Sequence, residues 1–463
     1  MELYRPNGLT AKDLCDIETG AAEILENIGI QVTNPEWLER LKETGVRFDN
    51  DSALIDESVT IRILEERKRL PSTGTGHTTG YTGEPSSYSS HYECPITGEV
   101  LLFTSDILSD MTRYMQVVSE EYGISPGVPG YPADIPVELE SAARYYYAAL
   151  HCETDWPKDP TSVRAAGGIF RMAEIMGEPM REMSAYMASP LRFGGESFDI
   201  IFAYHKRLKS ITVTSMPSLG ATTPLSLIPA YALTLAEVVG GAYLLNLLTG
   251  LPADFAVRLL PFDFYDLNIS FGTPENTLLE WLNAQINAHL HGIDWTPAFI
   301  GMYSWASRAG VQATAEKGLS MISGMLAGSR SFPGMGTLSL DEVFSPVQLL
   351  LDIELLKTGE RLMKGMPVER QEEDLTELIR DGMRTGFITH DHTLENHKEY
   401  IRNSRLFTRK TLSAQGNNPP NALENARAQA IALMKKLPGY QLDKVRKKEI
   451  TAIYQRLLAG EIV

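Results

Sequence analysis

From about residue 123 the sequence repeats one pattern, in which a short apolar or β-branched run ends in Pro, Gly, Ser or Asp and a longer helical pattern follows. Each repeat predicts a strand followed by a helix, and eight alternating units favour a (β/α)8 barrel, the TIM-barrel architecture, over an open sheet. The strands are expected before Trp156 and at 124–128, 183–187, 210–214, 254–259, 298–302, 329–332 and 386–389. The helices are expected at 136–150, 163–176, 197–208, 225–248, 274–289, 312–326, 340–359 and 375–383.

The segments before and after these units complete the predicted organisation. Thr10 can cap a helix over 11–28 that Gly29 ends, and a second helix is expected to start near Asn34. Residues 72–90 are rich in Ser, Thr, Gly and Tyr, which predicts a junction formed by an irregular segment or by a strand-and-turn excursion. Residues 1–122 should therefore form a helical and irregular extension packed on the barrel. Residues 123–463 should form the barrel with C-terminal helices, in which the charged stretch 443–448 is interpreted as a solvated helical face.

Composition and charge exclude several classes of function. The chain has 42 Lys and Arg against 59 Asp and Glu, a formal charge of −17, which disfavours binding to a nucleic-acid backbone. Cys15, Cys94 and Cys152 are too few and too scattered for a disulfide framework, and the first residues carry no apolar run typical of a signal peptide. We expect a reducing, cytoplasmic location.

One apolar stretch, 225–251, is long enough to raise the question of a membrane span. Pro229, Glu237 and Gly240 interrupt it, and a strand-like segment precedes it, so we interpret it as a buried helix and expect no membrane partner. The sequence also lacks a GxxxxGK[ST] loop, a GxGxxG motif after a strand and a Gly-x-Ser-x-Gly elbow. It therefore gives no support for a nucleotide-binding site or a serine hydrolase.

The residues that directly follow the strands of such a barrel meet at one open mouth, where barrel enzymes carry out their chemistry. The aromatic residues Phe264, Tyr303 and Trp305 favour a cage for a quaternary ammonium, because ring faces attract a cation that cannot donate hydrogen bonds. Core packing is the alternative for these rings. Arg308 can hold a substrate carboxylate bidentately, or it is simply an exposed arginine at a helix start.

The segment from Thr389 to Thr393 contains two histidines at alternate positions. On a strand His390 and His392 point to the same side, so both can contact one ligand, and a bound metal ion is the less favoured interpretation. The plainer alternative is a polar strand end whose histidines bond to the backbone. No metal site is predicted.

Several motifs, in this order and spacing, resemble the trimethylamine methyltransferase family of corrinoid-dependent enzymes, and the resemblance covers nearly the whole chain. They are residues 213–217 (Val-Thr-Ser-Met-Pro), 220–224 (Gly-Ala-Thr-Thr-Pro), 272–275 (Gly-Thr-Pro-Glu), 312–317 and 387–394. The resemblance implies a (β/α)8 barrel and methyl transfer from an amine to the cobalt of a separate corrinoid protein. Archaeal trimethylamine members carry pyrrolysine in the segment that corresponds to about 301–311. This chain has only standard residues there, which places it with the non-pyrrolysine members, some of which demethylate glycine betaine, proline betaine or carnitine.

The resulting hypothesis is a methyltransferase that moves a methyl group from a small quaternary amine, such as a betaine, to the Co(I) corrinoid (cobalamin) of a partner protein. A quaternary ammonium already carries a neutral amine as its leaving group, so the protein mainly has to position the methyl carbon and exclude water. No SAM and no nucleotide are expected, and the chain is expected to form a homo-oligomer.

Site residues follow from this hypothesis. Phe264, Tyr303 and Trp305 would form the cage and Arg308 would hold a carboxylate, while His390 and His392 would orient the substrate or contact the corrinoid edge. Contacts to the cofactor are assigned to residues after the expected strands, namely Ser215, Met216 and Met335. Two alternatives stay open: demethylation of a tertiary amine or methoxy compound, and a non-catalytic barrel that binds a quaternary amine or the corrinoid partner.

Overall fold

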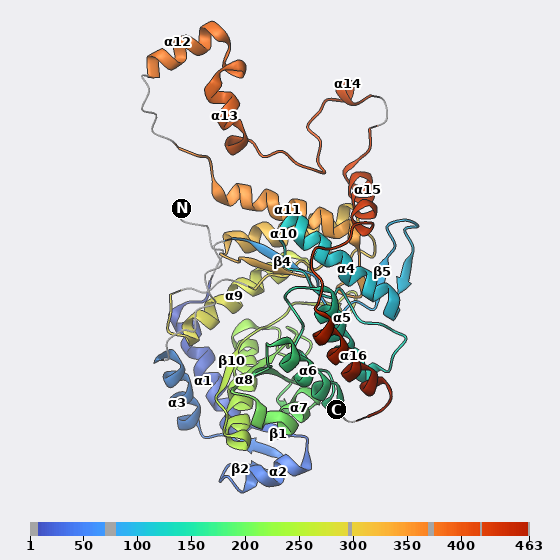
Figure 1. Cartoon of the computed structure of the whole chain (residues 1–463). Helices are drawn as coiled ribbons and strands as arrows, with labels where there is room; N and C mark the ends of the chain where they lie inside the picture. Colours follow the sequence, from blue (N-terminus) through green and yellow to red (C-terminus); the bar gives the residue numbers. More distant parts are fainter. Residues whose placement is uncertain (1–7, 70–79, 295–298, 369–374, 417–418, 462–463) are drawn as a thin grey trace.

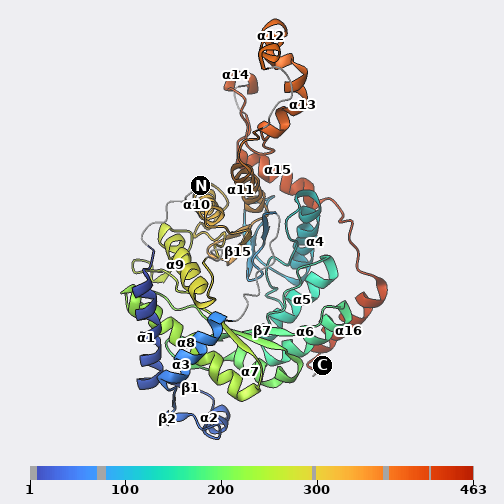
Figure 2. The same ribbon diagram turned by 90° about the vertical axis from the view of Figure 1, so that its left-hand side faces the viewer.

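Helices α4 to α11 follow one another, in chain order, around a central space (Figure 2). The structure is a computed structural model, and it describes residues 8–69, 80–294, 299–368, 375–416 and 419–461. Hydrogen bonds join neighbours in this ring: Tyr231 of α8 donates to Asn283 of α9 at 3.1 Å, and Tyr114 of α4 donates to the Pro346 carbonyl of α11 at 3.3 Å. The last helix of the ring therefore meets the first. The ring consists of α4 (Ser105–Tyr122), α5 (Glu140–His151), α6 (Val163–Met176), α7 (Glu196–Tyr204), α8 (Leu227–Thr249), α9 (Pro274–Leu290), α10 (Val311–Leu326) and α11 (Pro346–Lys364).

Local sequence explains where these helices begin and end. Thr104 and Ser162 accept hydrogen bonds from the first turns of α4 and α6, and Thr273 caps α9, which starts with proline. Helices α4 and α8 end at Gly123 and Gly250, which adopt left-handed φ values of 69° and 71° that other residues reach only at a cost.

Three of the predicted strands are confirmed inside the ring. Strands β7 (Glu182–Met187), β9 (Ser210–Ser215) and β10 (Ala253–Ala256) form a parallel sheet in the order β10-β9-β7. Met183, Ala185 and Met187 are buried in the main core, whereas Tyr186 points to the other side of β7 and is 45% exposed. Alternate residues of this sheet therefore face the helices and the central space.

Strands from the N-terminal part of the chain pair with strands from the end of the ring. Strand β4 (Thr82–Glu84) pairs in parallel with β13 (Ser331–Pro333), and the Ser125 amide donates to the Gly83 carbonyl at 3.1 Å. A second sheet has the order β14-β15-β5-β6. Its strands are β5 (His91–Glu93), β6 (Val100–Leu102), β14 (Thr337–Leu338) and β15 (Val343–Phe344).

The first seventy residues cover α8 from outside. Helices α1 (Ala11–Asn27), α2 (Pro35–Lys42) and α3 (Glu57–Arg69) all contact α8. The sheet β2-β3-β1-β8 lies beside them, formed by β1 (Ile30–Val32), β2 (Arg47–Asp49), β3 (Ser52–Leu54) and β8 (Arg192–Phe193). Within the described chain α8 is long and apolar enough to cross a membrane, yet 72% of its apolar window is buried inside the molecule. The prediction of a buried helix is confirmed.

The remaining elements are not helices of the ring. They are the hairpin β11 (Phe262–Asp263) and β12 (Asn268–Ile269), the short helices η1 (Val137–Leu139), η2 (His205–Arg207) and η3 (Phe387–Thr389), and the helices α12 (Leu375–Thr385), α13 (Asp391–Tyr400), α14 (Leu412–Gln415), α15 (Ala422–Met434) and α16 (Lys444–Leu458). Helix α15 packs on α11 and α4, and α16 packs on α5 and α6. Residues 443–448 at the start of α16 are exposed, as predicted. Helices α12 and α13 extend away from the body (Figure 1).

The predicted strand at 329–332 is confirmed in part as β13, whereas the remaining predicted strands are wrong. Residues 124–128 form no strand, because Pro126 lacks an amide proton and a ladder cannot run through it. The segment before Trp156 and residues 299–302 form no strand either, and residue 298 lies outside the described residues, as do 72–79 of the predicted junction. Residues 387–389, predicted as the last strand, form η3, whose Thr389 amide bonds locally to Gly386. The described residues thus form a mixed α/β fold with small sheets, and these sheets do not join into one continuous barrel.

Candidate active site

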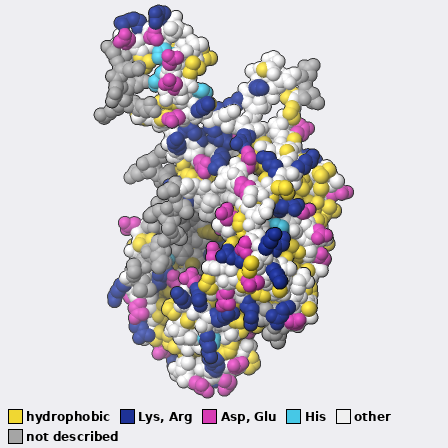
Figure 3. Space-filling view, in the orientation of Figure 1, with side chains coloured by type: hydrophobic (Ala, Val, Ile, Leu, Met, Phe, Trp, Pro, Cys, Tyr) yellow, Lys and Arg dark blue, Asp and Glu magenta, His cyan; other side chains and the backbone are white. Residues whose placement is uncertain are grey.

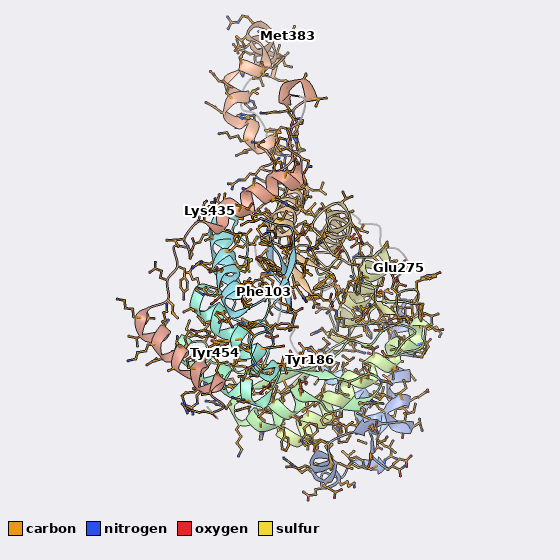
Figure 4. The ribbon with its side chains drawn as sticks, turned by 90° about the vertical axis from the view of Figure 1, so that its right-hand side faces the viewer. Phe103, Tyr186, Glu275, Met383, Lys435 and Tyr454 are labelled. Atoms are coloured by element: carbon orange, nitrogen blue, oxygen red, sulfur yellow. The ribbon has the colours of Figure 1, made fainter. Side chains whose placement is uncertain are left out.

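Tyr186, near the end of β7, lies on the inner side of the ring of helices (Figure 4). Its side chain is 45% exposed, yet burial by the surrounding protein raises the pKa of its phenol. A residue can be both accessible and enclosed only if it lines a hollow. The charged groups that act on its pKa are Asp159, Arg258 and Arg144, so residues from several segments converge on this hollow.

Arg258 follows β10 by two residues and is fixed by a buried carboxylate of α9. Its Nε and Nη2 atoms donate to Glu280 Oε1 at 3.0 and 2.9 Å, and the Glu280 side chain is only 2% exposed. Burial raises the pKa of Glu280 while Arg258 opposes that rise. The remaining nitrogen, Nη1, lies 4.0 Å from Met216 Sδ, and the guanidinium lies 4.7 Å from the centre of the Phe299 ring. Glu280 thus engages Nε and Nη2 of Arg258, while Nη1 lies on the side of Met216.

A second arginine that acts on the pKa of Tyr186 is also anchored by a carboxylate. The buried Arg144 of α5 donates from Nη1 to Asp159 Oδ2 at 3.0 Å and to Ser87 Oγ at 2.8 Å. Tyr88 donates its hydroxyl to the same Asp159 oxygen at 2.5 Å, and the Arg144 guanidinium lies 4.7 Å from the centre of the Tyr88 ring. Burial raises the pKa of Tyr88, so this phenol stays neutral and keeps its donor proton.

Tyr303 is the predicted cage residue that shares this neighbourhood. Burial raises its pKa to about 12, and the charges that act on it include Arg258, Asp341 and Glu84. Burial also raises the pKa of Glu84 and of Asp341, with a smaller contribution from a neighbouring acid in each case. We define the mouth as Tyr88, Asp159, Tyr186, Arg258 and Tyr303 together with the carboxyl groups of Glu84 and Asp341. Their phenols are neutral. Arg144 pairs with Asp159 and Arg258 pairs with Glu280, so Glu84 and Asp341 are additional acids beside two balanced pairs.

The other predicted cage residues gather around the hairpin β11–β12. Trp305 donates its indole Nε1 proton to the Ile269 carbonyl at 3.1 Å. Phe264 is 54% exposed and packs edge to face on Phe262, with ring centres 5.3 Å apart. Arg308 is exposed in the turn before α10. The structure therefore brings Trp305 and Phe264 to one hairpin, while Tyr303 has the contacts that connect it with the mouth.

The three predicted cofactor contacts are separated. Met216 is 47% exposed and lies beside Arg258, so it borders the mouth. Ser215 is fully buried. Its hydroxyl opposes the rise that burial causes in the pKa of Glu237 in α8, so Ser215 faces the helices. Met335 is fully buried in the second core, where its sulfur fills the space left by Gly83. Strand alternation explains the split between Ser215 and Met216, because successive side chains point to opposite faces.

The predicted histidine pair lies on the projecting segment, away from the mouth (Figures 1 and 2). His390 is the N-cap of α13, and its Nδ1 accepts the His392 amide proton at 3.3 Å. Its Nε2 lies 3.3 Å from Asp381 Oδ2 of α12. The two side chains do not share a strand face, because this segment has no strand beside it to pair with. No group of three or more potential metal ligands occurs in the part of the chain that the structure describes.

Sequence reasoning missed Arg258, Tyr186 and Arg144. The first two had a usable signal, because both lie near the ends of predicted strands, at alternate positions from buried residues. Arg144 had none, since an arginine within a helical pattern is usually a solvated residue.

A cavity of about 430 Å³ lies elsewhere, between α11, α15 and the segment 402–406. Its arginines are already engaged: Arg402 donates to Glu354 at 2.6 Å and Arg405 donates to Glu121 at 2.8 Å. The ion pairs make this cavity a joint between segments, so the candidate site is the mouth.

Comparisons of this sequence with known families and proteins agree on one class of enzyme. Residues 132–457 match the family model for trimethylamine methyltransferase (MTTB). Trimethylamine methyltransferase MttB2 of Methanosarcina mazei is 24% identical over 489 aligned positions, which cover 96% of this chain and 94% of that protein. L-carnitine:corrinoid methyltransferase of Eubacterium limosum is 22% identical and is aligned over 86% of each chain. The crystal structure of Methanosarcina barkeri monomethylamine methyltransferase aligns with a TM-score of 0.42 at 11% identity, over 98% of this chain and 94% of that one.

Proposed function

This chain belongs to the trimethylamine methyltransferase (MTTB) family, and from that premise we propose that it is a corrinoid-dependent methyltransferase that demethylates a small quaternary amine of the betaine type. The methyl acceptor is the corrinoid of a partner protein. Relatives named for trimethylamine and for L-carnitine support a methylated amine as the substrate class. The three cysteines are free, which is compatible with the cytoplasmic location proposed for it.

The proposal includes a (β/α)8 barrel as the frame that assembles the mouth. In this barrel β4 is the first strand, the segment 124–130 takes the second position without forming a strand, and β13 is the eighth and closes the ring on β4. The parallel pairing of β4 with β13 and the hydrogen bond from Met302 to Pro333, at 2.6 Å, support this order. The order of helices α4 to α11 around the centre supports it as well (Figure 2). The barrel then begins ahead of residue 123, and the mouth lies at the carboxyl ends of its strands, the end that carries the chemistry in barrel enzymes.

The observation that carries the proposed function is the excess of acid beside neutral phenols. Glu84, Asp159 and Asp341 meet Tyr186 and Tyr303, and the pKa values of both phenols are raised. Neutral aromatic rings attract a quaternary ammonium. The buried acids Glu84 and Asp341 add to that attraction when they are ionised, and a bound cation favours their ionised form. A substrate that keeps its positive charge without any proton to donate suits such a site.

The carboxylate of a betaine would bind to Arg258. Two of its nitrogens are engaged by Glu280, and Nη1 is left on the side of Met216. Arg308, the anchor predicted from sequence, is exposed in the turn before α10. We therefore propose Arg258 as the anchor and keep Tyr303 in the cage. Trp305 and Phe264 would form the outer wall, on the hairpin β11–β12.

The mouth also fits a large apolar cofactor that approaches from outside. Tyr186, Met216 and Phe299 are 45%, 47% and 53% exposed, so folding leaves apolar surface uncovered there. Corrinoid cobalt supplies the nucleophile when the partner protein delivers it. The residues of this chain bind the ammonium, hold the carboxylate and keep water from the methyl carbon. Because the leaving amine is neutral, no side chain needs to donate a proton. His390 and His392, on the projecting segment, are not required for this chemistry.

The test supplies reduced free cobalamin as methyl acceptor and follows substrates by proton NMR. Glycine betaine, L-carnitine and trimethylamine are compared, each with the wild-type chain and with Arg258→Lys and Arg308→Lys as a matched pair. We expect demethylation of a betaine-type substrate, lost in Arg258→Lys and retained in Arg308→Lys. Consumption of trimethylamine alone would replace the substrate class. Binding by calorimetry with no demethylation of any amine would favour the non-catalytic barrel.

A further inference from the structure

Residues 375–416, which we call the arm, extend away from the body and expose an apolar helix face (Figures 1 and 2). In α12, Leu375, Ile379 and Met383 are spaced by four residues, so they lie along one side of the helix. They are 67%, 45% and 77% exposed. Such a stripe normally faces a protein core, and here it faces solvent.

The rest of the arm also exposes apolar side chains and buries few residues. Among the described residues of the arm, Gly382 and Leu406 alone are buried. Short isolated helices such as α12 and α13 are marginal in water, because most helix stability comes from packing of the apolar face. The arm therefore lacks a core of its own and needs a covering surface. Further exposed apolar side chains in it are Phe387, Ile388, Leu394, Ile401, Phe407 and Leu412.

The root of the arm is fixed to the body. Arg402 donates to Glu354 Oε1 at 2.6 Å, and the Glu354 side chain is 5% exposed. Arg405 donates to Glu121 at 2.8 Å, and Leu406 is buried in the second core. These two ion pairs fix the returning segment 402–405 to α11 and α4. A docking element has this combination of a fixed base and an uncovered apolar face.

We propose that the arm packs against a second copy of this chain. The arm contains seven Lys and Arg against five Asp and Glu, a charge of +2 within a chain of −17, so the remainder carries −19. Lys and Arg side chains gather where the arm meets the body (Figure 3). Because Arg402 and Arg405 pair with Glu354 and Glu121 of the same chain, the rest of the arm has five cations against five acids. A neutral arm can therefore approach another copy without the repulsion that two acidic bodies exert on each other.

The position and size of the arm agree with this occupant. Helix α11 begins at Pro346, after the strands that border the mouth, and the arm follows its other end at Lys364. A corrinoid protein that docks at the mouth is therefore not the partner that we expect to cover the arm. Nine large apolar side chains on the arm are exposed. At about 100 Å² each they supply about 900 Å² per copy, which matches the ~800 Å² per partner of a stable interface.

The test is sedimentation of the full chain at micromolar concentration. The variants are Ile388→Glu and Met383→Glu in the arm, with Ile96→Glu on the body as the control, because Ile388 and Ile96 are both exposed, at 82% and 68%. We expect wild type and Ile96→Glu to sediment at twice the 51.3 kDa chain mass or more. Both arm variants should sediment as single chains with unchanged circular dichroism.

Three results would overturn the proposal. They are a monomeric wild type, an arm variant as large as wild type, and arm variants that keep their mass but no longer bind a corrinoid protein. The last result would assign the arm to the other class of partner. Because the mouth residues are unchanged in every variant, failure of this proposal leaves the methyl-transfer test unaffected.

Discussion

The mouth and the arm both leave large side chains accessible, but they do so in opposite ways. In the mouth, Tyr186 is 45% exposed while its neighbours Arg258 and Arg144 are held by carboxylates. In the arm, Ile388 is 82% exposed, and the ion pairs that join the arm to the body lie at the root. An enclosed and electrostatically fixed surface is suited to a small charged ligand, whereas an open apolar face is suited to a macromolecule.

This difference predicts how substitutions in the two regions divide between stability and binding. A fixed network in low dielectric is costly to break, because each ion pair is already desolvated. An exposed apolar side chain contributes little to the fold that it stands on. Four experiments, from the largest expected effect to the smallest, would break or sharpen the comparison.

Removal of Arg258 should have the largest effect on stability. Arg258→Met leaves the Glu280 carboxylate, 2% exposed, without its partner, and loss of one member of a buried pair costs about 3–5 kcal/mol. Because burial already raises the pKa of Glu280, the variant should recover stability as pH falls and Glu280 takes up a proton. Urea unfolding at several pH values measures both effects.

The control for Arg258 is the double variant Arg258→Met/Glu280→Gln. Removing the uncompensated charge should restore most of the lost free energy of unfolding, and the result should no longer depend on pH. A single variant as stable as wild type would mean that the mouth is not held by this pair. The contrast with the arm would then disappear.

Acid should weaken the ring of helices through His151. This residue ends α5 and lies 2.7 Å from Ser109 of α4, and burial, aided by Arg113 and Lys447, lowers its pKa to about 4. An unfolded histidine titrates near pH 6.5, so the unfolded state binds the proton first. Stability should therefore be full above about pH 6.5 and should decrease by about 2–3 kcal/mol as pH falls toward 4.

The comparison variant for this effect is His151→Gln, which keeps a polar group opposite Ser109 without a titrating ring. The difference in unfolding free energy between wild type and variant should change across this pH range. A difference that stays constant would show that His151 does not titrate with folding. Arm variants should share the wild-type pH profile.

Sequence patterns could predict the parts of the fold that depend on local alternation. Met183, Ala185 and Met187 alternate with polar residues, and β7 forms where this pattern lies. Strand β4 could not be predicted, because three residues carry no period and its partner β13 lies near the other end of the ring. The same limit explains the error at His390, since a short alternating run becomes a strand only beside another strand.

For the candidate site the same reasoning recovered some residues and not others. The order of the units placed Tyr303 and Met216 after the strands, and both border the mouth. The pairing of Arg258 with Glu280 depends on how α9 sits against β10, which no local pattern encodes. The exposure of a side chain could not be predicted either. The apolar spacing in α12 is that of a buried helix face, and the face is exposed because no neighbouring element covers it.

Substrate binding should respond to Tyr186 by about 1 kcal/mol. Tyr186→Leu removes the ring and should weaken a betaine by about fivefold, the loss expected for a cation–π contact that is not fully desolvated. Tyr186→Phe keeps the ring and should bind nearly as well as wild type. Calorimetry with glycine betaine compares the three proteins. Equal losses of affinity in both variants would assign the effect to the hydroxyl, and Tyr186 would then not be a cage residue.

Substitution in the arm should have the smallest effect on the fold of a single chain. At a concentration low enough to dissociate any assembly, Ile388→Glu and Ile96→Glu should each change the free energy of unfolding by less than about 0.5 kcal/mol, as exposed positions do. At higher concentration the wild-type melting temperature should rise, because association stabilises the folded state by mass action, and that rise should vanish in Ile388→Glu alone. Thermal melts over a dilution series measure both quantities. If Ile388→Glu destabilised the dissociated chain as Arg258→Met does, the arm would belong to the folded core and the distinction between the two regions would fail.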